Sequence, residues 1–253
     1  MTDGWHTGEL IGLDFETTGI DRAHDVPVSY ALVRARATAV VGREHALVDP
    51  GRPIPPAATA IHKITTEQAR AEGVPLAAAI GHVAGAVLDA GRRGVPVVGM
   101  NLAFDLSILD VQLRRLEGEG LVERGWSGPV LDVLVLDRHF DRFRSGKRRL
   151  ENLCAHYGVA VDSSHDASDD AASALGVLFA LCARYPELAA ADLDTLTTAQ
   201  ATWHREWATG YSRWRTERGL PALTPDEHSW PLGSAATGGQ DSPNDALITG
   251  AAR

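Results

Sequence analysis

The segment Leu10-Ile11-Gly12-Leu13-Asp14-Phe15-Glu16-Thr17-Thr18-Gly19 decides the fold and points to the chemistry of the chain. Side chains alternate between the two faces of a β-strand, so a strand over 10–16 places Asp14 and Glu16 on one face and Phe15 on the other. Neighbouring carboxylates repel each other and lower stability unless a cation lies between them. The segment therefore predicts a metal site at the end of a strand. A solvated acidic pair, or a cap for the next element, is the alternative.

The length and composition are those of a globular protein with one core and an appendage, since the chain has 253 residues. No apolar stretch approaches the roughly 20 residues that span a bilayer. The N-terminal residues have neither the basic region nor the apolar segment of a signal peptide. Cys154 and Cys182 lie far apart in the sequence and are expected to be free thiols in a reducing compartment. We expect a cytoplasmic protein without a membrane segment.

The charge balance is acidic, with 24 Lys and Arg against 33 Asp and Glu and a formal net charge of −9. Such a protein does not attract nucleic acid through its overall field. Carboxylates that bind metal ions reverse the local sign of the charge, however, so local patches matter more than the total. One basic run stands out, and it is either a phosphate-binding patch or a solvated loop: Arg138, Arg142, Arg144, Lys147, Arg148 and Arg149.

The order of the elements predicts an α/β fold. Apolar runs with strand character cover 10–16, 28–36, 39–48, 95–100 and 129–132, and the first three are joined by short connections. Helical periodicity covers 75–91, 101–119, 150–157 and 168–185. We expect a mixed sheet of three antiparallel strands plus two parallel strands, flanked by helices.

The composition changes near Pro186, which marks the end of a main domain over 6–185. Residues 186–222 are predicted to form a helical extension, in which four aromatic residues share one face: Trp203, Trp207, Tyr211 and Trp214. This stripe either packs on the main domain or serves as a docking surface or a stacking platform for bases. Residues 223–253 are rich in Gly, Ser, Pro, Ala and Asp and are predicted to be disordered.

Two further segments place polar groups where the chain enters a helix: Asn101-Leu102-Ala103-Phe104-Asp105 and His165-Asp166-Ala167-Ser168-Asp169-Asp170. Taken singly, the aspartates could be helix caps and His165 a surface residue. Taken together, Asp14, Glu16, Asp105, Asp170 and His165 suit a site for two divalent cations that hydrolyses phosphodiesters. Oxygen ligands favour Mg²⁺ or Mn²⁺ over zinc. A neutral histidine can take the proton from the attacking water.

These motifs resemble, in the same order, those of the DnaQ-like 3′–5′ exonucleases of the DEDDh type, which have a ribonuclease H-like fold. The resemblance spans residues 6–185 and is most specific at 14–19. Segments 150–154 and 61–65 are also similar to family segments. Met100 stands where many members have His, and Lys63 stands where Gly is common. Both departures concern substrate contacts rather than the catalytic groups.

The resemblance implies a role for each matching residue. Asp14, Glu16 and Asp170 would ligate two divalent cations, Asp105 would hold the second one partly through water, and His165 would be the general base. Asp169, next to Asp170, is an alternative ligand, although the spacing from the histidine favours Asp170. The residues implied to contact the substrate are Thr17, Thr18, His62, Asn101 and Phe104.

The function implied is metal-dependent removal of nucleoside monophosphates from the 3′ end of single-stranded DNA. Trimming of RNA 3′ ends is the alternative, because no residue in the sequence is seen to read the 2′-hydroxyl group. A module that binds nucleic-acid ends without cleaving them is a third reading. The resemblance extends to the proofreading subunits of bacterial DNA polymerases, so the C-terminal helix is a candidate site for a polymerase or other protein partner.

Overall fold

The computed structural model describes residues 4–160 and 166–233. Its six strands are β1 (Glu9–Thr17), β2 (Pro27–Arg36), β3 (Ala39–Asp49), β4 (Val74–Pro75), β5 (Val97–Gly99) and β6 (Val130–Asp132). The helices of the first half are α1 (Pro56–His62), α2 (Thr66–Glu72), α3 (Leu76–Arg92) and α4 (Leu102–Glu117), preceded by a 3₁₀ turn at Trp5–Thr7. The second half contains α5 (Val133–Phe140), α6 (Leu150–Tyr157), α7 (Ala167–Arg184), α8 (Pro186–Ala190), α9 (Leu193–Thr216) and α10 (Pro225–His228).

The sheet has the strand order β4-β3-β2-β1-β5-β6. Strands β1, β2 and β3 form an antiparallel meander, and β5 and β6 run parallel to β1. This confirms the predicted α/β fold with its mixed sheet and flanking helices. The sixth strand, β4, was not predicted, because its two residues at 74–75 are too few to produce a periodic pattern.

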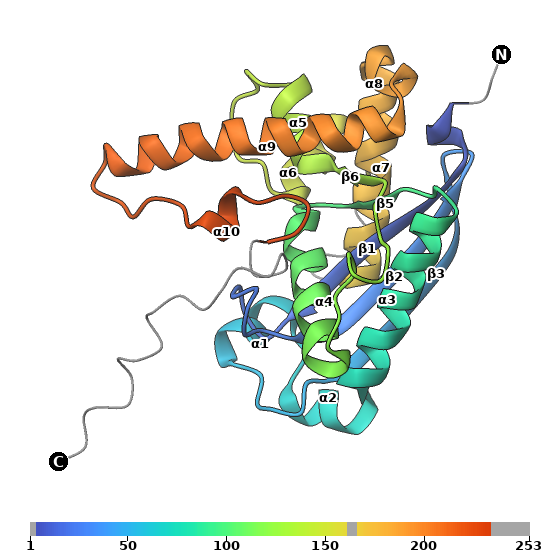
Figure 1. The fold of residues 1–253 in the computed structure, drawn as a ribbon, viewed down its shortest axis with the longest axis vertical. Helices are drawn as coiled ribbons and strands as arrows, with labels where there is room; N and C mark the ends of the chain where they lie inside the picture. Colours follow the sequence, from blue (N-terminus) through green and yellow to red (C-terminus); the bar gives the residue numbers. More distant parts are fainter. Residues whose placement is uncertain (1–3, 161–165, 234–253) are drawn as a thin grey trace.

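Helices cover both faces of the sheet (Figure 1). Helices α3 and α4 bury one face, where Leu13 and Phe15 of β1 enter the core beneath them. Helix α7, with α6 and α8 beside it, covers the other face, where Leu10 lies in a second apolar cluster. The alternation expected for β1 is therefore present. The side chains of Leu13 and Phe15 point to α3 and α4, and the carboxylates of Asp14 and Glu16 emerge on the opposite side.

Helix α9 protects the free edge of the sheet. The side chain of Gln200 makes two hydrogen bonds to β6, because its Nε2 donates to the Val130 carbonyl and its Oε1 accepts from the Asp132 amide, both at 2.8 Å. An edge strand with unpaired backbone groups invites association with other chains, and this glutamine satisfies them. Trp203 also packs on the body, stacked on His139 at 3.6 Å between ring centroids.

The segment 223–233 differs from the predicted disorder. It folds back against α9 and α4 and contains α10, which begins with a capping box formed by Thr224 and Glu227. Trp230 and Leu232 are buried in the same cluster as β1 and α4. The prediction of disorder was wrong for this segment because it followed the average composition, in which two isolated apolar residues have little weight. The prediction for 234–253 lies outside the described residues.

None of the helices in residues 4–160 and 166–233 has the length and apolar character needed to span a bilayer. The two cysteines are both buried and free, as expected from their separation in the sequence.

Candidate active site

Three carboxylates meet where β1 passes under the first turn of α7. Asp14 and Glu16 leave β1 on the α7 face, and Asp170 lies in the first turn of that helix. One oxygen of each of these carboxylates lies within 4.8 Å of the others. The close approach of helix and strand depends on Gly12, because a Cβ atom there would come within 2.9 Å of the Ala171 carbonyl oxygen. The strand pattern and this glycine therefore bring the three acids together.

Asp105 joins the group from the other side of the sheet. It lies in the first turn of α4, is buried, and its Oδ1 accepts a hydrogen bond from the Phe15 amide at 3.0 Å. Strand β5 ends at Gly99, before it could pair with this part of β1. The carboxylate of Asp105 thus takes the place of the missing strand partner. As a result, Asp105 is fixed beside the two acids of β1.

A second buried carboxylate, Asp132, holds the loop that leads into α4. Its two oxygens accept hydrogen bonds from the amides of Asn101 and Leu102, both at 3.0 Å, and it also caps α5 through the Leu134 amide. Asn101 has the left-handed conformation, with φ of 59°, which turns the chain from β5 into α4. Asp132 therefore sets the start of the helix that carries Asp105.

The electrostatics of the cluster favour a bound cation. Burial, followed by repulsion from Asp105 and Asp170, raises the pKa of Asp14 well above its usual range. Burial, and then the charges of Asp170 and Asp166, raise the pKa of Glu16 from 4.5 to about 7. Burial also raises the pKa of Asp105. A cluster of hard oxygen donors whose ionised forms are disfavoured fits a divalent cation such as Mg²⁺ or Mn²⁺.

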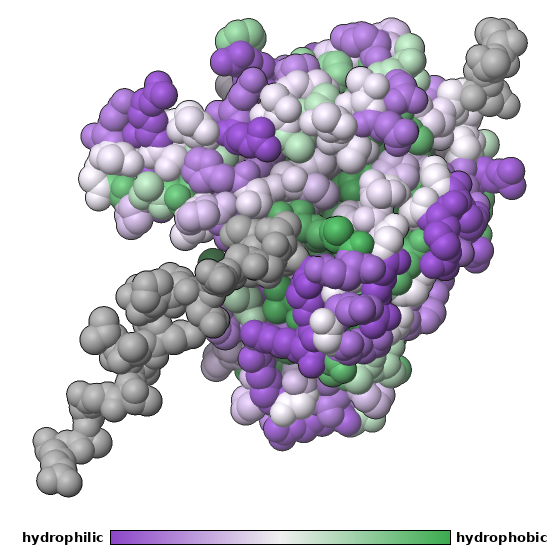
Figure 2. Space-filling model, viewed as in Figure 1, coloured by the Kyte–Doolittle hydropathy of each residue, from purple (hydrophilic) through white to green (hydrophobic). Residues whose placement is uncertain are grey.

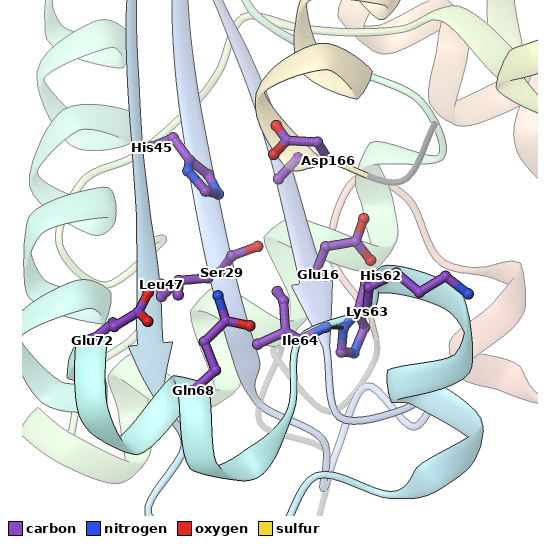
Figure 3. Close-up of a pocket in the computed structure, with 11 residues that line it drawn as sticks. Glu16, Ser29, His45, Leu47, His62, Lys63, Ile64, Gln68, Glu72 and Asp166 are labelled. Atoms are coloured by element: carbon purple, nitrogen blue, oxygen red, sulfur yellow. Dashed lines mark hydrogen bonds between the residues drawn. The ribbon is translucent and has the colours of Figure 1, made fainter. Parts of the chain in front are cut away.

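A pocket of about 440 Å³ opens beside Glu16 (Figure 3). Residues from β1, β2, β3, α1, α2 and the start of α7 surround it: Glu16, Ser29, His45, Leu47, His62, Lys63, Ile64, Gln68, Glu72, Asp166 and Ala167. Two of its buried polar atoms, Ser29 Oγ and His62 Nε2, have no hydrogen-bond partner within the described chain. Unsatisfied buried polar groups are costly, so a ligand in this pocket has two polar atoms to contact.

The protonation of His62 follows from its contacts. Burial lowers its pKa, so the ring is neutral at pH 7. Its Nδ1 accepts a hydrogen bond from the Ile64 amide at 3.1 Å. In the neutral ring the proton is therefore on Nε2, which interacts with the backbone of Thr17 without making a hydrogen bond to it. His62 thus offers one N–H donor close to Glu16.

The two threonines predicted to contact substrate have partners within the chain. The Thr17 hydroxyl donates to the Gly19 carbonyl at 2.6 Å. The Thr18 hydroxyl is buried, donates to Asp25 at 2.6 Å and accepts from Arg52 at 2.8 Å. Neither residue lines the pocket. Both hydroxyl groups hold the turn after β1 in shape, and a contact of these two residues with the substrate stays a prediction.

The other predicted site residues fall into three groups. Of the predicted substrate contacts, only His62 lines the pocket, whereas Asn101 and Phe104 do not. Asn101 is exposed and Phe104 is half-buried at the start of α4. His165 lies outside the described residues, five positions before Asp170.

Several pocket residues were missed by the sequence reasoning. Ser29 lies opposite Glu16 in the register of β1 and β2, so its position depends on strand pairing rather than on a motif. His45 and Gln68 come from β3 and α2, which only the folded structure brings to the pocket. The alternation of β2 combined with the turn length could have identified Ser29. We see no such signal for Gln68.

Comparison with known proteins agrees with this geometry. The model of an exonuclease family, RNase T, matches residues 11–178. The DNA polymerase III subunit epsilon of Treponema pallidum is 28% identical over 161 residues, which are 62% of this chain and 69% of that protein. A DNA polymerase III subunit epsilon-like protein of Rhodobacter capsulatus is 36% identical over 140 residues, or 50% of this chain and 17% of that protein.

The fold is also that of exonuclease I from E. coli, solved with a dT13 oligonucleotide, with a TM-score of 0.60. The sequence identity is 23%, and the match covers 72% of this chain and 42% of exonuclease I. The chain thus spans less than half of that enzyme and about two thirds of the Treponema subunit. Since the family model covers well over half of the sequence, including the acidic cluster, the chain belongs to the exonuclease family, as its DnaQ-like motifs predicted.

Proposed function

We propose that this chain removes nucleoside monophosphates from the 3′ end of single-stranded DNA in a reaction that requires two divalent cations, Mg²⁺ or Mn²⁺. The observation that carries the proposal is the cluster of Asp14, Glu16 and Asp170, with oxygens within 4.8 Å of one another, beside a polar pocket of about 440 Å³. A carboxylate cluster supplies the cation site, and the adjoining pocket supplies space for a terminal nucleotide.

The residues of the chain have separate tasks in this proposal. The clustered carboxylates, with Asp105 beside them, hold the cations, which when bound supply positive charge that stabilises the developing charge on the phosphate. The general base is His165, which accepts the proton of the attacking water. Ser29 and the Nε2–H of His62 offer polar contacts to the terminal nucleotide from the wall of the pocket.

The preference for DNA rests on the relatives. The names of the similar Treponema and Rhodobacter proteins refer to DNA polymerase III, and exonuclease I was solved with a DNA oligonucleotide. RNA 3′-end trimming is the competing substrate class, because discrimination needs a contact to the 2′-hydroxyl group. Matched DNA and RNA oligonucleotides in one reaction decide between them, and faster release from RNA would reverse the preference.

The test of the activity is a 3′-end digestion assay on 5′-labelled single strands with Mg²⁺, with Mn²⁺ and with a chelator. We expect stepwise release of mononucleotides that requires the cation and is lost in Asp14→Ala and His165→Ala. Glu119→Ala, at an exposed position after α4, is the matched control and should retain activity. Binding of 3′ ends without any release by the wild type would instead indicate an end-binding module.

We further propose a polymerase as a protein partner, on the names of the epsilon-like relatives. The test is co-purification of the full-length chain with the replicative polymerase of its host. An absence of co-purification at low salt would support a stand-alone nuclease.

A further inference from the structure

A second surface rich in aromatic residues lies away from the acidic cluster, along α5 and the outer half of α9. Three rings of α9 are stacked in series, since Trp207 and Tyr211 have centroids 5.2 Å apart and Tyr211 and Trp214 5.6 Å apart. Their planes differ by only 18° and 16°. Trp214 is 42% exposed, and Phe143, after α5, is 94% exposed. This α5–α9 surface therefore presents flat apolar faces to solvent.

Arginines accompany these rings. The guanidinium group of Arg138 lies 3.4 Å from the centroid of Trp207, and that of Arg218 lies 4.2 Å from Trp214. Arg142 lies farther from its ring, 5.9 Å from the centroid of Phe143. An arginine that stacks through its face keeps its N–H groups in the plane of the guanidinium available for phosphate oxygens. In Figure 2 the free end of α9 shows strongly hydrophilic residues beside paler ones.

A pocket of about 520 Å³ lies between α5 and α9 at the inner end of the stack. Arg138, Arg142, Trp207 and Tyr211 are among its lining residues. Burial lowers the pKa of Arg138 to about 10, so the group remains charged at pH 7. Within residues 4–160 and 166–233, the guanidinium groups of Arg138 and Arg142 stack on rings but have neither a hydrogen-bonded acceptor nor a carboxylate at ion-pair distance. Asp132 and Asp137 attract the guanidinium of Arg138 beyond ion-pair distance, and Glu206 lines the same pocket. The lining arginines still outnumber this one carboxylate, so the pocket favours an anionic ligand.

We propose that the α5–α9 surface binds single-stranded nucleic acid on the 5′ side of the 3′ end that enters the acidic cluster. Rings with nearly parallel planes suit bases, every one of which has a flat face, and the stacked arginines suit the phosphates between them. The chain carries a net charge of −9, so this local combination of arginine and aromatic groups contrasts with the rest of the molecule. An apolar peptide could place a side chain in the pocket, but it would gain little from the arginine edges.

The surface is connected to the catalytic end of the fold. Helix α5 begins directly after Asp132, and Asp132 holds the loop that enters α4 and carries Asp105. Arg138 is on the second turn of α5, within electrostatic reach of Asp132. The proposal rests on the proposed exonuclease function for the identity of the strand, but the surface itself can be tested without cleavage.

The first experiment measures binding alone, with a chelator present, through the fluorescence anisotropy of a labelled oligo-dT of about 30 nucleotides. Since each stacked base contributes about 1–3 kcal/mol, Trp214→Ala should weaken binding about tenfold, and Trp214→Phe should restore most of it. Leu116→Ala, which truncates another exposed apolar residue, is the control and should bind as the wild type does. Arg142→Gln should reduce the slope of log Kd against log salt by about 0.7, as expected for one lost phosphate contact.

The second experiment measures digestion as a function of strand length. For long strands, Trp214→Ala and Arg142→Gln should raise KM about tenfold with kcat unchanged, whereas oligonucleotides of about three residues should be cleaved as by the wild type. If both variants bind and digest long strands like the wild type, the surface does not bind nucleic acid, and a protein ligand becomes the better occupant. If the wild type cleaves nothing but the binding differences persist, the proposed function fails and this inference stands.

Discussion

Replacing Glu16 by Gln should stabilise the protein without cations and destabilise it, relative to the wild type, when cations are present. Glu16 shares a small volume with Asp14 and Asp170, and its ionised form is disfavoured by burial and by neighbouring charge. Gln keeps the size and most of the shape of the side chain but removes the charge. The substitution therefore separates the cost of assembling the carboxylates from the benefit of neutralising them.

The magnitude follows from the pKa of Glu16, which rises from 4.5 to about 7. One pKa unit corresponds to about 1.4 kcal/mol, so ionisation of Glu16 destabilises the folded state by at most about 3 kcal/mol. Because Glu16 is only half-buried, solvent screening reduces the expected value to about 1–2 kcal/mol. The folded state binds the proton of Glu16 more tightly than the unfolded state does, so the contribution of Glu16 to stability is greatest below pH 4.5 and falls as the pH rises to about 7. The stability of Glu16→Gln should not show this decrease with rising pH, because Gln carries no titrating group.

The assay is urea unfolding of both proteins at about pH 5 and about pH 8, with a chelator and with excess Mg²⁺ or Mn²⁺. With the chelator, the variant should gain about 1–2 kcal/mol on the wild type at the higher pH and little at the lower one. With cations at the higher pH, the wild type should gain stability by mass action and the variant much less. Glu119→Gln is the exposed control. If Glu16→Gln is less stable than the wild type in chelator at the higher pH, the reasoning about repulsion in this cluster is refuted.

Three more substitutions test the packing around the site. Gly12→Ala should push α7 away from β1 and lower the free energy of unfolding in urea by about 1–3 kcal/mol. It should also weaken the cation binding that calorimetry measures. An unchanged cation affinity would contradict the argument that helix and strand must approach closely here. Trp230→Ala should lower the free energy of unfolding by about 3–5 kcal/mol, because this ring is buried. The exposed Trp214→Ala is the control and should lower it by less than about 1 kcal/mol. Equal thermal shifts in the two variants would show that the segment 223–233 is not anchored. Arg148→Ala should cost about 1–3 kcal/mol, because Asp137 is buried and loses one of two arginine partners; an unchanged unfolding midpoint would count against this pairing.

The sequence was sufficient to predict the strand that carries the acidic pair. Alternation alone placed Asp14 and Glu16 on one face and Phe15 in the core, and the structure has this arrangement. The positions of Asp105 and Asp170 at helix starts were also readable from apolar periodicity. These features are local, since strand and helix periods are properties of a few consecutive residues.

The features that were missed depend on contacts between distant segments. Ser29 enters the pocket through the pairing of β1 with β2, and Gln68 enters it through the docking of α2. The hydroxyl of Thr18 is occupied by Asp25, seven residues later, and by Arg52 on another segment. No short window of sequence contains all of these partners. The motif therefore predicted a substrate contact for Thr18 but gave no sign of its hydrogen bonds to Asp25 and Arg52.

The basic run at 138–149 illustrates why a charge pattern alone could not decide its role. Arg144 and Arg148 both pair with the buried Asp137, and they hold the loop after α5 in place. Arg138 and Arg142 instead stack on aromatic rings at the α5–α9 surface. The solvated-loop interpretation is therefore wrong for Arg144 and Arg148, whose side chains are largely buried against Asp137, and phosphate binding by Arg138 and Arg142 stays a proposal.

The C-terminal extension supports the site as well as covering the sheet edge. Gln200 of α9 makes hydrogen bonds to two backbone groups on the outer edge of β6. Trp230 donates to Asp132, whose carboxylate positions the loop before Asp105. Truncation after Tyr185 would remove Gln200 and Trp230 and leave the buried carboxylate of Asp132 with fewer donors. We therefore expect the truncated chain to lose cation affinity in calorimetry even where circular dichroism shows that it folds. Full affinity in a folded truncated chain would show that the extension is independent of the site.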